Sequence, residues 1–268
     1  MRAAVLGKPI AHSLSPALHL AAYQALGLDD WSYTAIECGE DELAGVVSSL
    51  GSDWAGLSLT MPLKRVVLSL LDVTDAIAAA TGGANTLIFR DGLRHGYNTD
   101  VPGIVTALTE AGVKSIGRVT ILGAGATACS AIAALADLGV TSADVVVRDR
   151  SRATGLLTAA GHLEVTVSLT DAPPAASDLL ISTLPAGAAD GYAARMLAGQ
   201  LAPGAVLDVV YADWPTPLAH AAGRIGATVV SGFEMLVHQA AGQVELMTGR
   251  PAPVAVMRAA GERALATR

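Results

Sequence analysis

The sequence predicts an α/β fold with two successive series of alternating strands and helices, and three observations predict it. Short apolar runs of strand length alternate with segments of helical period along most of the 268 residues. The apolar residues, rich in alanine and valine, suit helices packed on buried parallel strands. Hydrophobic residues make up 52% of the chain and charged residues 15%, which is enough for more than one core and too little charge for disorder.

The first series occupies the N-terminal part of the chain. Buried strands, each followed by a helical pattern, are predicted at residues 3–7, 32–38 and 54–59. Two further strands at 84–89 and 93–98 flank Arg90 to Gly92, an Asp-Gly turn of the kind that makes a hairpin. A helix is predicted from about Val101 to Ala111.

The second series is longer. Its predicted strands are 118–125, 143–148, 163–168, 178–183, 205–210 and 227–232, and its predicted helices are 127–139, 151–160 and 217–223. The last segment, from Gly232 to Leu265, contains two helices separated by residues 249–253, and no strand follows them. We expect these two helices to pack back on the first half of the chain.

A glycine-rich turn follows the first strand of the second series. Gly123, Gly125 and Ala128 have the G-x-G-x-x-A spacing at the start of a helix. Small residues at this spacing allow a tight turn, close approach of the backbone to a pyrophosphate and close packing of helix on strand. The alternative is a glycine turn with a purely structural role. We predict a Rossmann-type dinucleotide-binding domain. Its cofactor-binding turn comprises Gly123, Ala124, Gly125, Ala126 and Thr127.

Three charged residues follow the next predicted strand, near the place where an adenosine ribose would end. Arg148 and Arg152 favour NADP, because a 2′-phosphate calls for arginine. Asp149 favours NAD, because a carboxylate can accept from a free 2′-hydroxyl and repels a phosphate. A solvated surface turn is a third interpretation. We predict NADP as the cofactor, with NAD as the alternative.

Charge and cysteine content exclude several classes of function. The net charge is −7 and the Lys and Arg residues are scattered, whereas a nucleic-acid-binding face needs clustered cations. No apolar run of about eighteen residues and no signal-type N-terminus occur, so we expect no membrane segment. Cys38 and Cys129 lie in unrelated contexts, which argues against a disulfide framework or a metal site and favours a reducing cytoplasm.

The stretch "HSLSP", from His12 to Pro16, carries two serines. Ser15 before Pro16 is typical of a helix start, because a serine oxygen can accept from the first N–H groups and proline fits the first helical position. That role leaves Ser13 unexplained. Residues two apart in an extended segment point the same way, so Ser13 and Ser15 could donate together to one anionic group.

Other polar residues also lie at the ends of predicted strands or the starts of predicted helices. Lys64 lies at the start of a predicted helix, where a surface lysine is the alternative interpretation, and Asp100 follows a strand where it could cap a helix. Six such groups fall at or just after the carboxyl ends of predicted strands, which is the edge where open α/β sheets bind ligands. They are Ser13, Ser15, Thr60, Lys64, Asn85 and Asp100. Together they predict a pocket for a polyhydroxylated ligand.

Seven motifs resemble the shikimate dehydrogenase family in order and spacing. They are GKPIAHSLSPALH, LTMPLK, GGANTL, GYNTD, GAGATA, DVVYADWPTPL and GFEMLVHQA, and they span nearly the whole chain. The resemblance implies reversible, NADP-dependent reduction of 3-dehydroshikimate to shikimate, on the route to chorismate and aromatic amino acids. It also implies a split α/β substrate domain, residues 1–101 and 235–268, around a Rossmann domain of residues 102–234.

The resemblance implies a role for each matching residue. Lys64 matches the family's catalytic lysine, with Asp100 as its partner. Ser13 and Ser15 match paired hydroxyls on the substrate carboxylate, and Tyr211 matches a tyrosine near that carboxylate. The positions that hold the ring hydroxyls are Thr60, Asn85, Asp100 and Gln239. The positions on the nicotinamide side are Val209, Gly232 and Met235.

Two other functions stay open. Asp149 supports an NAD-dependent quinate/shikimate dehydrogenase, but the second hydroxyl of the carboxylate pair is typically threonine in that branch, so Ser15 argues against it. The other is a nucleotide-sensing protein that has lost the chemistry, and retention of both Lys64 and Asp100 counts against it. The sequence leaves monomer and homodimer both open.

Overall fold

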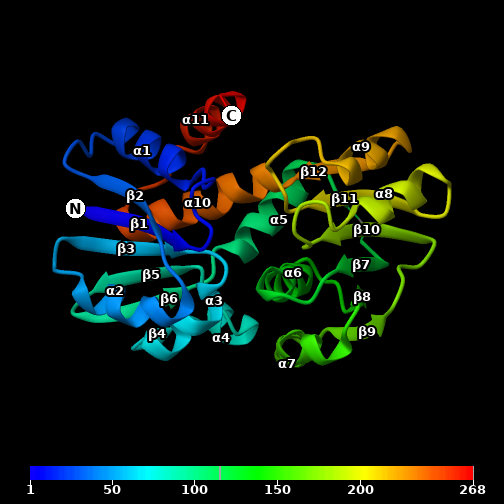
Figure 1. Cartoon of the computed structure of the whole chain (residues 1–268), viewed down its shortest axis with the longest axis horizontal. Coiled ribbons are helices and arrows are strands. Elements are labelled where there is room, and N and C mark those ends of the chain that lie inside the picture. Colours follow the sequence, from blue (N-terminus) through cyan, green and yellow to red (C-terminus); the bar gives the residue numbers. More distant parts are fainter. Residues whose placement is uncertain (115, 268) are drawn as a thin grey trace. The chain divides into compact units, whose positions relative to one another are not determined.

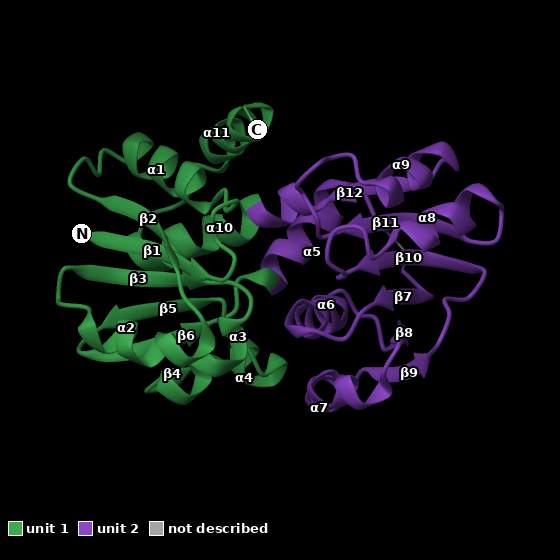
Figure 2. Cartoon of the chain, in the orientation of Figure 1, with its two compact units in different colours: residues 1–100, 237–268 green, residues 101–236 purple. Residues whose placement is uncertain are grey.

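The computed structural model describes residues 1–114 and 116–267, and the chain forms two compact units (Figures 1 and 2). Unit 1 comprises residues 1–100 and 237–268, so the chain leaves this unit after Asp100 and re-enters it at Val237. Unit 2 comprises residues 101–236. Each unit has its own sheet and its own buried core, which confirms the predicted α/β fold.

Unit 1 contains a six-stranded mixed sheet. Its strands are β1 (Arg2–Gly7), β2 (Ser32–Glu37), β3 (Trp54–Leu59), β4 (Val73–Thr74), β5 (Thr86–Arg90) and β6 (Leu93–Tyr97), in the order β2-β1-β3-β5-β6-β4. β1 pairs in parallel with β2 and β3, whereas β5 is antiparallel to β3 and β6. Asp91 and Gly92 connect β5 to β6 with φ values of 55° and 75°, the left-handed values of a type I′ turn. The predicted hairpin is confirmed.

Helices cover both faces of this sheet. They are α1 (Ser15–Ala25), α2 (Leu43–Ser49), α3 (Leu63–Val66), α4 (Ala76–Thr81), α11 (Val254–Ala266) and most of α10 (Gly232–Thr248), with short 3-10 turns at Glu40–Glu42 and Val67–Leu70. Leu6, Leu57 and Leu87 pack with residues of α2, α3 and α4 on one face. Val5 and Ile88 pack with residues of α1 and α10 on the other. α11 packs on α1, so the C-terminal helices return to the first half as expected.

Unit 2 contains a six-stranded parallel sheet. Its strands are β7 (Val119–Leu122), β8 (Ser142–Val146), β9 (Thr166–Thr170), β10 (Ala176–Ser182), β11 (Ala202–Asp208) and β12 (Thr228–Ser231), in the order β9-β8-β7-β10-β11-β12. Its helices are α5 (Asp100–Glu110), α6 (Ala126–Asp137), α7 (Thr154–His162), α8 (Asp190–Leu197) and α9 (Pro217–Arg224), with a 3-10 turn at Arg150–Ala153. α5, α6 and α7 share a core on one face, and α8 and α9 share a core on the other. This is the 3-2-1-4-5-6 strand order of the Rossmann fold, as predicted.

One strand of unit 2 begins three residues later than predicted. The sequence predicts a strand at 163–168, and the structure has β9 at Thr166–Thr170. The reason is the end of α7, where the Leu163 N–H still donates to the Ala159 carbonyl (3.1 Å) and Glu164 turns the chain with a φ of 56°. The first residues of the predicted strand therefore close a helix.

Two expectations from composition concern membranes and cysteines. In the part of the chain that the structure describes, no helix has the length and apolar character needed to cross a bilayer. Cys38 and Cys129 are both buried and both outside any disulfide. No disulfide therefore links the two cysteines.

Candidate active site

One edge of the unit 1 sheet brings together several of the polar residues predicted to bind a ligand. The carboxyl ends of β1 and β3 lie side by side there, because Leu6 pairs with Leu59 and the Thr60 N–H donates to the Leu6 carbonyl (2.9 Å). Gly7 permits this close approach, since a Cβ on it would lie 2.3 Å from Cγ2 of Thr60 and 2.9 Å from the Met61 carbonyl oxygen. The segments that follow β1 and β3 therefore begin in contact.

Asn85 reaches the same edge from the opposite direction. It precedes β5, so the prediction that it lies at the carboxyl end of a strand is wrong. Because β5 runs antiparallel to β3, the Leu59 N–H donates to the Asn85 carbonyl (2.7 Å). The Asn85 N–H donates to the carbonyl of Tyr97 at the end of β6 (3.0 Å). Antiparallel pairing thus brings Asn85 beside the residues that follow β3 and β6.

The start of α1 differs from the prediction that Ser15 caps this helix. α1 begins at Ser15, and its N-cap residue is Leu14, whose side chain offers no acceptor. Leu14 already has helical backbone angles (φ −88°, ψ −9°), so the prediction that Ser15 caps the helix is wrong. Instead the Ser13 Oγ accepts from the Ser15 N–H (3.3 Å). Ser13, which the sequence left without a structural role, therefore stabilises the helix start.

Lys64 and Asp100 form a buried ion pair. Nζ of Lys64 lies 2.5 Å from Oδ2 of Asp100, and the two side chains are 15% and 5% exposed. Lys64 lies on α3, where its carbonyl accepts from the Ala84 N–H (2.8 Å). Asp100 is the first residue of α5, and its N–H donates to Oδ1 of Asn98 (3.1 Å). Removing either partner of such a pair leaves an uncompensated buried charge, so the pair holds both segments in place.

The Asn85 side chain connects this ion pair to α10. Nδ2 of Asn85 donates to the second carboxylate oxygen of Asp100 (2.9 Å) and to Oε1 of Gln239 (3.1 Å). Gln239 lies on α10 and is buried. Lys64, Asn85, Asp100 and Gln239 therefore meet at one place, although they come from four separate segments of the chain.

This arrangement can exchange a proton with a ligand. A lysine ammonium offers three N–H donors, whereas a carboxylate accepts only. Lys64 needs one of its donors for Asp100, and its side chain is the more exposed of the two. The chemistry available is general acid and base catalysis at a bound hydroxyl or carbonyl.

Three supporting residues were missed in the sequence. Asn85 Oδ1 accepts from the Thr86 hydroxyl and from the Thr99 N–H, both at 2.8 Å, and the Asn85 carbonyl accepts from Nε2 of Gln243 (3.2 Å). Thr86 directly follows Asn85, and Thr99 directly precedes Asp100. Gln243 lies one helical turn after Gln239. That adjacency is the signal that could have found them.

The glycine-rich turn of unit 2 lies at the carboxyl end of β7, whose neighbours are β8 and β10. Gly123 has a φ of 103°, and a Cβ on it would lie 2.7 Å from Oγ1 of Thr183. Gly125 is the N-cap residue of α6, and a Cβ on it would meet no atom within 4 Å. Packing therefore does not require a glycine at the start of this helix, where backbone N–H groups can bind an anion. The other turn residues, Ala124, Ala126 and Thr127, are partly exposed.

The charged residues after β8 differ in what they contact. Oδ1 of Asp149 accepts from the N–H (3.0 Å) and the hydroxyl (2.6 Å) of Ser151, and these hydrogen bonds lower the pKa of Asp149. The carboxylate that favours NAD therefore caps a local 3-10 turn. Arg148 and Arg152 are exposed at the carboxyl end of β8, where the adenosine ribose of a bound dinucleotide would lie.

The predicted nicotinamide-side residues lie where β11 and β12 end. Val209 and Gly232 are in direct contact, since a Cβ on Gly232 would lie 2.2 Å from the Val209 carbonyl oxygen. Met235 is buried in the core that α5, α6 and α7 share. Only glycine at position 232 allows these two segments to approach so closely.

The loop that carries Tyr211 is held by a buried carboxylate that the sequence did not indicate. Oδ2 of Asp208 accepts from the Thr216 hydroxyl (2.7 Å), and Oδ1 accepts from the Val210 N–H (3.3 Å). Burial raises the pKa of Asp208, and these hydrogen bonds oppose the rise. Asp208 thus joins the two ends of the Tyr211 loop.

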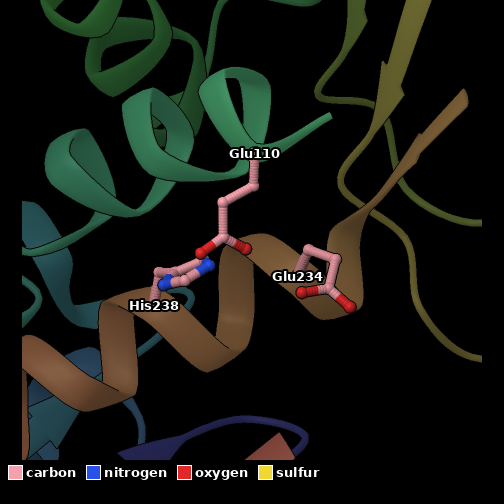
Figure 3. Close-up of side chains that lie close together, drawn as sticks. All are labelled: Glu110, Glu234 and His238. Carbon is pink, nitrogen blue, oxygen red and sulfur yellow. The ribbon is translucent and has the colours of Figure 1, made fainter. Parts of the chain in front are cut away.

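Two glutamates and a histidine are residue types that can bind a metal ion, so they bear on the expectation that the chain holds no metal. Figure 3 shows Glu110 on α5 and Glu234 and His238 on α10. The carboxylate oxygens of Glu110 and Glu234, both in unit 2, approach within 4.8 Å of each other. Nε2 of His238, in unit 1, lies 3.4 Å from Nη2 of Arg258. Glu110 is exposed, and exposed acidic groups are common without an ion, so we assign no metal ligand here.

Comparison with known proteins gives a consistent set of matches. The model of the shikimate dehydrogenase substrate binding domain matches residues 5–87, and that of the shikimate 5'-dehydrogenase C-terminal domain matches residues 232–260. The NADP(+) shikimate dehydrogenase of Halobacterium salinarum is 38% identical over 261 residues, covering 96% of each chain. The crystal structure of Mycobacterium tuberculosis shikimate dehydrogenase is 43% identical with a TM-score of 0.89, over 98% of this chain and 99% of that chain. Shikimate 5-dehydrogenase from Thermus thermophilus, in complex with NADP(H) and shikimate, is 32% identical with a TM-score of 0.87, over 99% and 100%.

Proposed function

The chain belongs to the shikimate dehydrogenase family, and we propose that the Lys64–Asp100 pair of unit 1 performs its proton transfer. The protein is an oxidoreductase that acts on the CH–OH group of shikimate, and it reversibly reduces 3-dehydroshikimate to shikimate. NADP, when bound, supplies or accepts the hydride. The reaction belongs to the biosynthesis of chorismate and aromatic amino acids.

Lys64 exchanges the proton at the oxygen of the reacting C–O group. In the reducing direction, a proton must reach the carbonyl oxygen while hydride reaches the carbon, and the Lys64 ammonium donates it. In the oxidising direction, the pair accepts the hydroxyl proton. Asp100 balances the charge of the Lys64 ammonium. The observation that carries this assignment is the buried ion pair, with Nζ of Lys64 2.5 Å from Oδ2 of Asp100.

The remaining polar residues suit the other groups of shikimate, which are a carboxylate and ring hydroxyls. We assign the carboxylate to the hydroxyls of Ser13 and Ser15, with Tyr211 near it, because hydroxyls donate well to an anion. The ring hydroxyls need partners that both donate and accept, which threonine and amide side chains provide. We assign them to Thr60, Asn85, Asp100 and Gln239.

Each unit supports one half of the function. We assign residues 1–101 and 235–268 to the substrate domain, because unit 1 contains the ion pair and the amide cluster. We assign residues 102–234 to the NADP-binding domain, because unit 2 contains the glycine-rich turn on a Rossmann sheet.

The cofactor assignments follow the geometry of unit 2. The turn from Gly123 to Thr127 suits the pyrophosphate, because the helix that it begins presents backbone N–H groups. Arg148 and Arg152 suit the 2′-phosphate of NADP, while Asp149 stays bonded to Ser151. The residues assigned to the nicotinamide side are Val209, Gly232 and Met235.

A comparison of two substrates with two cofactors tests the function. The kcat/KM for shikimate with NADP should exceed the values for quinate and for NAD. A higher kcat/KM for quinate with NAD would favour the quinate/shikimate dehydrogenase alternative, for which Asp149 is the sequence support. Absence of any shikimate-dependent change in nicotinamide absorbance would favour a nucleotide-sensing protein instead.

The cellular compartment and the oligomeric state of the protein are open to direct measurement. We expect the protein in the cytoplasm, because a chain with only two cysteines, Cys38 and Cys129, suits a reducing compartment. Monomer and homodimer are the two assemblies open to the chain. Light scattering of the purified protein distinguishes the two.

A further inference from the structure

A chain of buried hydrogen bonds crosses unit 1 behind the proposed site. The Tyr33 hydroxyl on β2 donates to Oγ of Ser58 on β3 (2.6 Å), and the Ser58 hydroxyl donates to Oε1 of Gln243 on α10 (2.7 Å). Nε2 of Gln243 donates to Oγ1 of Thr86 (3.1 Å). The Thr86 hydroxyl donates to Oδ1 of Asn85 (2.8 Å). Five side chains from β2, β3, α10 and the start of β5 are therefore linked.

Every bond of this chain has the same direction. Each hydroxyl uses its single hydrogen to donate forward, so it can only accept from the group behind it. Gln243 consequently accepts at Oε1 and donates at Nε2, and Asn85 accepts at Oδ1. Nδ2 of Asn85 is then the atom that faces Asp100 and Gln239. An Asn85 amide turned the other way would place its oxygen against the Asp100 carboxylate.

Burial prevents water from replacing these bonds. Tyr33 and Ser58 are 3% exposed, Gln243 and Asn85 are 1% exposed, and Thr86 is fully buried. A polar group that loses its partner at such a site remains unsatisfied. Hydrogen bonds in series also polarise one another, so the orientation of one amide supports the next.

We propose that Thr86 and Gln243 are positioning residues of the substrate site, which hold the Asn85 amide with its N–H groups towards Asp100 and the substrate. This inference rests on the proposed function, because shikimate binding is its readout. Thr86 touches the acceptor end of the amide, and Gln243 binds both Thr86 and the Asn85 carbonyl. Neither residue needs to contact the substrate for this role.

The test compares Thr86→Val with Thr86→Ser. Valine keeps the volume of threonine and removes the hydroxyl, whereas serine keeps the hydroxyl. Thr86→Val should raise both the KM and the Kd of shikimate about tenfold, which is the range for one lost buried hydrogen bond, and leave the KM of NADP unchanged. Thr86→Ser should return the shikimate values to within about twofold of the wild type, because the donor to Asn85 is restored.

Thr120 provides a matched control. It is fully buried on β7, and its hydroxyl has no hydrogen-bond partner among the described residues. Thr120→Val should therefore leave both KM values unchanged. If Thr86→Val does not fold, Ser58→Ala tests the same chain two links further back, and it should raise the shikimate KM by about two- to threefold, less than the direct loss of one bond.

Three results would overturn the positioning role. They are a wild-type shikimate KM in a folded Thr86→Val enzyme, equal impairment by valine and serine at position 86, or a fall in kcat that follows the folded fraction while KM stays constant. A wild-type shikimate KM in the Ser58→Ala enzyme would likewise overturn the positioning role. A wild-type enzyme without shikimate turnover would remove the proposed function and this inference with it, whereas the variant comparisons would remove only this inference.

Discussion

Lys64→Ala is the sharpest perturbation of the proposed mechanism. The substitution removes the Nζ that lies 2.5 Å from Asp100 and leaves no other cation in the described cluster of Asn85, Asp100 and Gln239. Loss of a general acid or base lowers a rate by about 10²–10⁴, equivalent to about 2.7–5.5 kcal/mol of transition-state stabilisation. We expect kcat to fall by this factor and shikimate binding to change less.

The same substitution has a structural cost. Asp100 is 5% exposed and loses its cation, although its bond from Asn85 remains. Breaking a buried ion pair costs about 3–5 kcal/mol. Because Asp100 keeps its hydrogen bond from Asn85, we expect the unfolding free energy to fall by the lower value, about 3 kcal/mol. Urea unfolding of the variant measures this loss separately from the loss of kcat.

The assay is steady-state oxidation of shikimate, followed by the absorbance of reduced nicotinamide. Lys114→Ala is the control, because Lys114 is an exposed lysine outside the proposed site. An unchanged kcat in a folded Lys64→Ala enzyme would refute the assignment of proton transfer to Lys64. A kcat restored by raising the shikimate concentration would assign Lys64 to binding instead.

Three further predictions concern pH, packing and cofactor choice. Burial lowers the pKa of His19 from 6.5 to about 4, so the unfolded chain binds this proton more tightly than the folded chain does. The free energy of unfolding should therefore keep its full value above pH 6.5 and fall by up to about 3 kcal/mol as the pH approaches 4. His19→Phe should flatten this acid limb in pH-dependent urea unfolding, and an unaltered slope would contradict the attribution. Gly7→Ala should lower the unfolding free energy by about 1–3 kcal/mol, because its Cβ would lie 2.3 Å from Thr60. Gly45→Ala on α2 is the control: its Cβ meets no atom within 4 Å, so it should raise the unfolding free energy by about 0.5–1 kcal/mol. Equal Tm values for the two variants would argue against the clash at Gly7. Arg148→Ala should raise the KM of NADP about tenfold and leave that of NAD unchanged, and equal changes in both would remove Arg148 from 2′-phosphate binding.

The elements that the sequence predicted correctly have local causes. The Asp91-Gly92 pair predicted the β5–β6 hairpin because few residues other than glycine and aspartate adopt left-handed φ values in succession. The glycine-rich turn predicted the Rossmann unit because its conformation depends on a few neighbouring small residues. Alternation of apolar strands and helices predicted the class for a similar reason, since period is a property of one segment at a time.

The errors have a different origin. The Ser15 cap was wrong because the backbone enters the helix at Leu14, a choice that a Ser-Pro pair does not reveal. Asn85 was assigned to the carboxyl end of a strand although it precedes β5, and it reaches the same sheet edge only because β5 pairs antiparallel with β3, which the sequence does not reveal. In both cases the local signal was present, and the surrounding structure decided how it was used.

By itself the sequence determined the class of fold, the hairpin, the glycine-rich turn and the residue types that the chemistry needs, because each depends on neighbouring residues. Tertiary structure alone decided which of those residues meet. Lys64 and Asp100 are 36 residues apart, Asn85 and Gln239 are 154 apart, and Ser58 and Gln243 are 185 apart. Contacts over such separations leave no periodic trace in the chain, since they arise from sheet pairing and from the return of α10 to unit 1. The ion pair and the one-way hydrogen-bond chain behind it are therefore consequences of packing.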